Sequence, residues 1–127
     1  MLHEVLKHYL DTVDQAVLGC DGVYVERYTE EILTPERVNL RLRLRFDTGY
    51  LLEIHEAVII DNQNLVHLDY RYHCQNEQNC LVFRYDCTPH FPELASFPHH
   101  KHFLDAVIVS ERPEIGHVLR EILGHQK

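Results

Sequence analysis

The sequence contains no long apolar run and no segment that resembles a signal peptide. Its longest uncharged apolar stretches, such as residues 57–60, are far shorter than the ~20 residues that a membrane-spanning helix requires. The N-terminal residues lack a basic segment followed by an apolar block, which a secretory signal would show. We therefore expect a cytoplasmic protein that has no membrane partner.

The sequence also lacks the cysteine and histidine spacings of common metal sites. None of its cysteines forms a CxxC pair, and neither HExxH nor the spacing of a structural zinc site is present. In a reducing cytosol such cysteines serve as small apolar fillers rather than as disulfide partners. They are Cys20, Cys74, Cys80 and Cys87. There is no repeat, linker or low-complexity tract, so the 127 residues predict a single domain, 1–127.

A basic character is missing from the composition as a whole. The formal net charge of -8 argues against indiscriminate binding to nucleic acid. The distribution of charge is more informative than the total, because acidic residues concentrate at positions 26–36 and 111–121 whereas arginines recur in expected strands. These arginines are Arg41, Arg43, Arg45, Arg71 and Arg84.

Hydrophobic periodicity predicts the main elements. Apolar residues at spacings of three and four indicate an amphipathic helix over residues 2–18, and Gly19 would end it. From Val23 the period changes to two, and residues 38–46 alternate without a fault, as in a half-buried strand. A turn at 47–49 would pair this strand with the next, placing Leu44 opposite Leu52 and Arg43 opposite Glu53. Two further strands are expected at 65–74 and 80–87.

If the apolar faces of these last two strands are matched, residues of like charge lie opposite each other on the other face. Matching places Arg71 beside Arg84 and Asp69 beside Asp86, and like charges directly opposite each other are destabilising. Two explanations remain open: diagonal neutralisation between the arginines and aspartates in a solvated lattice, or a bound ligand that supplies the missing charge.

The C-terminal part completes the predicted fold. Residues 103–109 indicate an edge strand or a short docking segment, and Pro113 lies in the first turn of a helix that ends near Gly124. The order of elements predicts an α+β fold: an antiparallel sheet of about five strands, with the N- and C-terminal helices packed on one face. Edge strands at Val23 or Phe103 would be open to pairing, which makes a homodimer an expectation.

Histidines concentrate in one proline-rich segment. Four of the chain's 11 histidines lie between positions 90 and 102, directly after the strand that carries Arg84 and Asp86. Prolines at 89, 92 and 98 remove backbone donors and favour extended conformations, so we expect a stiff, non-helical loop that presents its side chains. The four histidines are His90, His99, His100 and His102.

Arginines beside histidines suit metal-independent cleavage of RNA. Guanidinium groups hold phosphate, and imidazoles supply the base for the 2′-hydroxyl and the acid for the leaving 5′-oxygen. A solvated arginine face, or a non-catalytic module that docks a partner through that face, would explain the same arginines. A metal-dependent phosphoryl- or nucleotidyl-transfer hydrolase is a further alternative, with a transition metal at His99, His100 and His102, near Asp86. Adjacent residues of an extended segment point in opposite directions, so at most His100 and His102, or His99 with a more distant partner, would converge easily.

The same residues resemble a known bacterial family. The phrases at 70–73, 83–86, 89–90 and 97–102, the last reading Phe-Pro-His-His-Lys-His, resemble the TumE family of toxins from type II toxin-antitoxin modules. The resemblance covers about residues 65–105. It implies a small cytosolic toxin that is neutralised by a cognate antitoxin, one with a helix-turn-helix domain.

The roles of individual residues follow from their chemistry rather than from the resemblance. Arg71 and Arg84 would hold phosphate, Asp86 would orient a histidine, and Lys101 would stabilise developing charge. The full catalytic candidates are Asp86, His90, His99, His100, Lys101 and His102. The candidates for substrate binding are Arg43, Tyr70, Arg71 and Arg84. RNA is the expected substrate, and no cofactor is required for this reaction.

Overall fold

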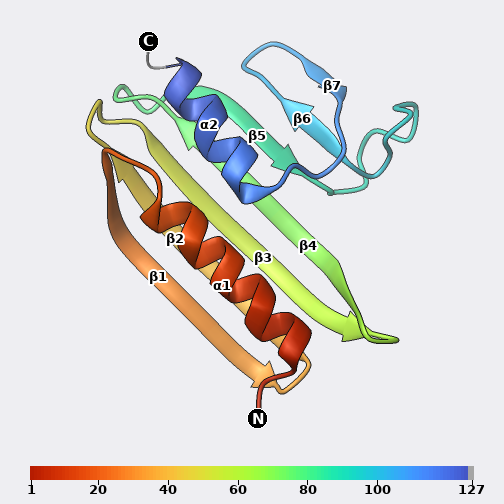
Figure 1. The fold of residues 1–127 in the computed structure, drawn as a ribbon. Helices are drawn as coiled ribbons and strands as arrows, with labels where there is room; N and C mark the ends of the chain where they lie inside the picture. Colours follow the sequence, from red (N-terminus) through yellow and green to blue (C-terminus); the bar gives the residue numbers. More distant parts are fainter. Residues whose placement is uncertain (126–127) are drawn as a thin grey trace.

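The computed structural model describes residues 1–125 and forms one antiparallel sheet with two helices. The strands lie in the sheet in chain order, and α1 (Glu4–Leu18) and α2 (Ile115–His125) lie on the same face (Figure 1). The strands are β1 (Val23–Thr34), β2 (Arg37–Phe46), β3 (Leu51–Asp61), β4 (Asn64–Gln75), β5 (Leu81–Asp86), β6 (His100–His102) and β7 (Val107–Val109). The predicted α+β class is confirmed, with 7 strands in place of about five. No described helix is long and apolar enough to cross a membrane.

Both helices form where the apolar periodicity predicts them. α1 buries one stripe against the sheet, its first turn is capped by the His3 imidazole, which accepts from the backbone N–H of Val5, and Gly19 follows its last residue. The buried residues of α1 are Leu6, Leu10, Val13 and Val17. α2 buries Ile115, Val118, Leu119 and Ile122 in the same way. These stripes join the inward side chains of β2–β5 in one hydrophobic core.

The predicted pairing of β2 with β3 is confirmed. Leu44 lies opposite Leu52 and Arg43 opposite Glu53, and the N–H of Phe46 donates to the carbonyl of Tyr50 at 2.8 Å. A slip of one residue would carry the arginines of β2 into the core. The alternation and the short turn therefore determine the same register.

The predicted pairing of β4 with β5 is wrong by two residues. Arg71 lies opposite Asp86 and His73 opposite Arg84, so opposite charges face each other and the predicted like-charged pairs do not occur. The Asn76 side chain accepts from the backbone N–H groups of Gln78 and Cys80 in the turn, and the ladder has an irregularity between Cys74 and Gln75. A slip of two residues keeps every side chain on its face, so hydrophobic alternation cannot detect it. No ligand is needed to balance charge between these strands.

The prediction that the whole histidine-rich segment is a loop is wrong for its last three residues. His100–His102 forms β6, which pairs with β5 on one side and with β7 on the other. Of the predicted segment 103–109, only the last three residues form a strand, and β7 is an edge of the sheet, as β1 is at the opposite side. The remaining loop, residues 87–99, which we call the 87–99 loop, connects β5 to β6.

A buried polar cluster joins the helices to the sheet. The carboxylate of Glu56 on β3, a residue only 4% exposed, accepts hydrogen bonds from the hydroxyls of Tyr9 on α1 and Tyr72 on β4. His67 Nε2 lies 3.2 Å from the same carboxylate, and Arg112 donates to the Tyr72 hydroxyl at 3.1 Å. Burial alone would raise the pKa of Glu56, but its contacts with His67, Tyr72 and Tyr9 together hold that pKa below its usual value.

The lowered pKa of Glu56 predicts a contribution to stability that acid removes. Because the pKa of the folded state lies below that of the unfolded state, the contribution is present above the unfolded value near 4.5 and is lost as pH falls through the folded value. We expect the stability difference between the wild type and Glu56→Gln to be largest at pH 7 and to shrink steadily below about pH 4.5. Urea unfolding at several pH values measures it, and a difference that stays constant down to pH 3 would contradict this account.

Candidate active site

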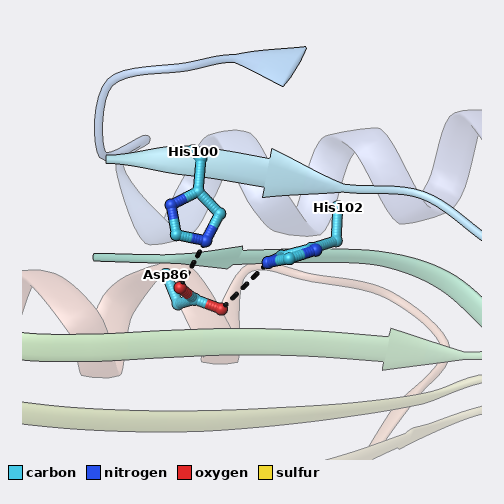
Figure 2. A group of neighbouring side chains, drawn as sticks. All are labelled: Asp86, His100 and His102. Atoms are coloured by element: carbon cyan, nitrogen blue, oxygen red, sulfur yellow. Dashed lines mark ion pairs between the residues drawn. The ribbon is translucent and has the colours of Figure 1, made fainter. Parts of the chain in front are cut away.

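Three titratable side chains meet on the face of the sheet that the helices leave uncovered. Asp86 ends β5, and the imidazoles of His100 and His102 on β6 both point toward its carboxylate (Figure 2). Asp86 lies opposite His100 in the ladder, and His102 is two residues further along the same face. His100 Nε2 is 2.7 Å from Asp86 Oδ1, and His102 Nε2 is 3.6 Å from Oδ2. The pairing of β5 with β6 thus assembles the cluster.

Two further hydrogen-bond donors hold the carboxylate of Asp86. The Nε of Arg84 donates to Oδ2 at 3.0 Å, and the backbone N–H of Thr88 donates to Oδ1 at 3.1 Å. The residue is only 4% exposed although it lies away from the helices. Its carboxylate is therefore fixed in position, as a group that orients a histidine must be.

The surroundings of His100 determine the role of its Nδ1. Nδ1 lies 2.9 Å from the carbonyl oxygen of Pro98, which can only accept, so Nδ1 donates. Nε2 then faces Asp86 and has no hydrogen-bond partner of suitable geometry among the described residues, although Oδ1 is close. The ring of Phe91 packs edge-on against both imidazoles, at 5.0 Å from His100 and 5.7 Å from His102 between ring centroids.

A cavity of about 310 Å³ opens beside this cluster. It contains guanidinium, carboxylate and imidazole groups from three strands, β4, β5 and β6, and from the 87–99 loop. Its lining residues are Arg71, Arg84, Asp86, Thr88, His90, Phe91 and His102. Partial burial lowers the pKa of His102, and the nearby charge of Arg84 lowers it further, so that this imidazole favours its neutral form. The cavity thus brings together two candidate phosphate ligands and two candidate proton-transfer groups.

Other predicted site residues lie on the opposite face, beneath the helices. Tyr70 is 1% exposed, and its hydroxyl contacts His99 Nδ1 at 2.9 Å, with the two rings stacked. Lys101 forms an ion pair with Glu121 on α2 and lies 4.7 Å from the ring centroid of Tyr85. Strand geometry explains the position of Lys101, because alternate residues of β6 point to opposite faces of the sheet. None of these three residues lines the cavity.

The position of Lys101 leads to a prediction about stability. Lys101→Met is expected to lower the free energy of unfolding by about 1–3 kcal/mol, because it leaves Glu121 without its cation and removes the cation–π contacts. Since the side chain lies away from the cavity, activity per folded molecule should not change. Urea denaturation and activity of the purified variant measure the two effects, and a folded but inactive variant would contradict the assignment.

Two more predicted site residues, Arg43 and His100, do not line the cavity. Arg43 lies on the uncovered face but is bound to Glu26 at 2.8 Å and to Glu53 at 3.0 Å, outside the cavity. His100 belongs to the cluster but is only 1% exposed, so it contacts Asp86 from inside the protein and does not line the cavity. Sequence reasoning missed Phe91 and Thr88. The only signal for Phe91 was its position between His90 and Pro92.

The fold and this cavity define a class: a small α+β protein with an arginine- and histidine-lined pocket on the open face of its sheet. The model of the family described as Toxin TumE matches residues 11–125, which is most of the chain. The chain therefore belongs to the TumE toxin family, and it is a toxin of a toxin-antitoxin system with an antitoxin as partner. No curated protein and no solved structure showed a significant match.

Proposed function

We propose that this toxin is a metal-independent ribonuclease that acts in the cytoplasm and cleaves RNA in the cavity between β4, β5, β6 and the 87–99 loop. The observation that supports this proposal is the presence of Arg71, Arg84, His90 and His102 around one cavity. Cleavage of RNA by its own 2′-hydroxyl needs a base, an acid and cations at the phosphate, and these four side chains supply all three.

Each residue has a role in this reaction. Arg71 and Arg84 bind the phosphate; only the Nε of Arg84 is engaged by Asp86, so its terminal nitrogens can face the substrate. One imidazole of the pair His90 and His102 takes the proton of the 2′-hydroxyl as its oxygen bonds to phosphorus. The other gives a proton to the 5′-oxygen as the P–O5′ bond breaks. The products are a 2′,3′-cyclic phosphate and a 5′-hydroxyl.

The reaction is tested with purified toxin, RNA and a chelator. We expect cleavage to persist in excess EDTA and to leave ends that carry a 2′,3′-cyclic phosphate. Cleavage that EDTA abolishes would favour the alternative of a metal-dependent phosphoryl- or nucleotidyl-transfer hydrolase. If growth inhibition occurs without any cleavage, a binding module that docks its target through the arginine face is favoured instead; Arg84→Ala would then abolish inhibition and His90→Ala would not.

We further propose the nature of the protein partners. The cognate antitoxin carries a helix-turn-helix DNA-binding domain and neutralises the toxin by direct contact. A homodimer would form through an open sheet edge, and β1 is the longer one, with exposed apolar side chains at Val25, Ile32 and Leu33. Light scattering of the purified toxin measures its mass, and a monomer at micromolar concentrations would contradict the dimer.

A further inference from the structure

We propose that Asp86, His100 and His102 form a binding site for one divalent transition-metal ion of the Zn²⁺ type. One donor atom from each residue lies within 4.8 Å of the other two, and all three residues are buried or partly buried. Imidazole nitrogen and carboxylate oxygen are ordinary ligands of zinc, which has three protein ligands and an open position in its catalytic sites. This site does not depend on the proposed ribonuclease, although the two share His102.

The strongest evidence is the orientation of His100. Its Nδ1 donates to the Pro98 carbonyl, so Nε2 is the ring nitrogen that faces the carboxylate of Asp86. Nε2 lies 2.7 Å from Oδ1 of Asp86 and is buried, but no hydrogen bond of suitable geometry joins the two atoms. A metal ion bound between them would satisfy both atoms. A histidine that binds metal through one nitrogen and donates its other N–H to a backbone carbonyl is the usual arrangement in metalloproteins.

His102 supplies the third ligand, and its Nε2 faces the other carboxylate oxygen of Asp86. Its Nε2 lies 3.6 Å from Oδ2 of Asp86, and the His100 and His102 ring centroids are 4.6 Å apart. Ligands of a tetrahedral ion with bonds of about 2.1 Å are separated by roughly 3.4 Å. The 3.6 Å between His102 Nε2 and Asp86 Oδ2 is close to this separation, whereas the 2.7 Å between His100 Nε2 and Asp86 Oδ1 is shorter, so these two atoms must move apart to admit an ion. Phe91 covers both rings and limits the access of water. Asp86 and His102 also line the cavity, so a water molecule or substrate in the cavity could reach an ion held by the triad.

Metal binding would change the chemistry of the cavity. A nitrogen of His102 that coordinates an ion cannot accept a proton. Zinc is therefore expected to inhibit a reaction that uses this imidazole as base or acid. The same triad thus gives the toxin an inhibitory site for a metal ion, next to the phosphate-binding arginines.

The test is a titration of the purified, tag-free toxin with ZnCl₂ after removal of metal by a chelator. Calorimetry and native mass spectrometry are expected to show one ion bound per chain. His102→Ala is expected to weaken the affinity at least 10-fold, as is Asp86→Asn, whereas His90→Ala should bind zinc like the wild type because His90 is outside the triad. Circular dichroism verifies that the variants are folded. If the wild type does not bind zinc, or His102→Ala binds it equally well, the proposed site is overturned.

An RNA cleavage assay with and without zinc separates this site from the proposed function. Binding together with inhibition supports both. Binding together with zinc-dependent activation supports the site and contradicts the metal-independent ribonuclease. Chelator-resistant cleavage without zinc binding overturns the site and leaves the ribonuclease intact.

Discussion

Replacing His90 with alanine is expected to lower RNA cleavage by a factor of about 10²–10⁴, which is the usual contribution of one positioned acid or base. His90 is exposed at the mouth of the cavity, so the substitution removes an imidazole without disturbing the core. The rate of cleavage of a defined RNA by the purified variant measures the effect. Growth inhibition on induction in cells should fall in parallel.

A matched control for His90→Ala is His55→Ala. His55 lies on β3 on the same face of the sheet but does not line the cavity, so its loss should leave cleavage unchanged. Because His90 lies outside the metal-binding triad, its replacement also separates loss of proton transfer from loss of metal. A triple variant, His90→Ala/His100→Ala/His102→Ala, that still inhibits growth would disprove the proposed chemistry.

Replacing Glu56 with leucine is expected to lower the free energy of unfolding by about 3–5 kcal/mol, which would be a large fraction of the stability of a domain of this size. Leucine fills a similar volume, so the main loss is polar. The hydroxyls of Tyr9 and Tyr72 lose their acceptor, and Arg112, whose Nη1 lies 4.0 Å from the carboxylate, loses its buried counter-charge. Urea denaturation measures the change.

The control for Glu56 is a second glutamate on the same strand. Glu53 pairs with Arg43 on the uncovered face, where both side chains are more than a third exposed, and such surface pairs contribute at most about 1 kcal/mol. Glu53→Leu should therefore change stability by a fraction of the effect of Glu56→Leu. Equal effects of the two substitutions would show that the buried cluster does not join the helices to the sheet as we describe.

The candidate site could be predicted from the sequence only in part. Arg71, Arg84, Asp86, His90 and His102 were identified from their residue types and line one cavity. The assignment of Lys101 to the same surface followed from interpreting its segment as a loop, in which neighbouring side chains can converge. In β6 alternate residues separate to opposite faces, and Lys101 lies against α2. A strand of three residues is too short to show a period in the sequence.

The sequence by itself determined the two helices, the longer strands with their buried and exposed faces, and one register. Periods of 3.6 and two residues are local properties, and the hairpin of β2 and β3 joins a strong alternation to a short turn. Only the tertiary structure decided the pairing of β4 with β5 and of β5 with β6. A shift of two residues leaves the hydrophobic faces unchanged, and the contact between Asp86 and His100 joins residues that a 13-residue loop separates. Asp86, His100 and His102 meet because non-local hydrogen bonding places β6 beside β5. No local pattern in the sequence indicates this pairing.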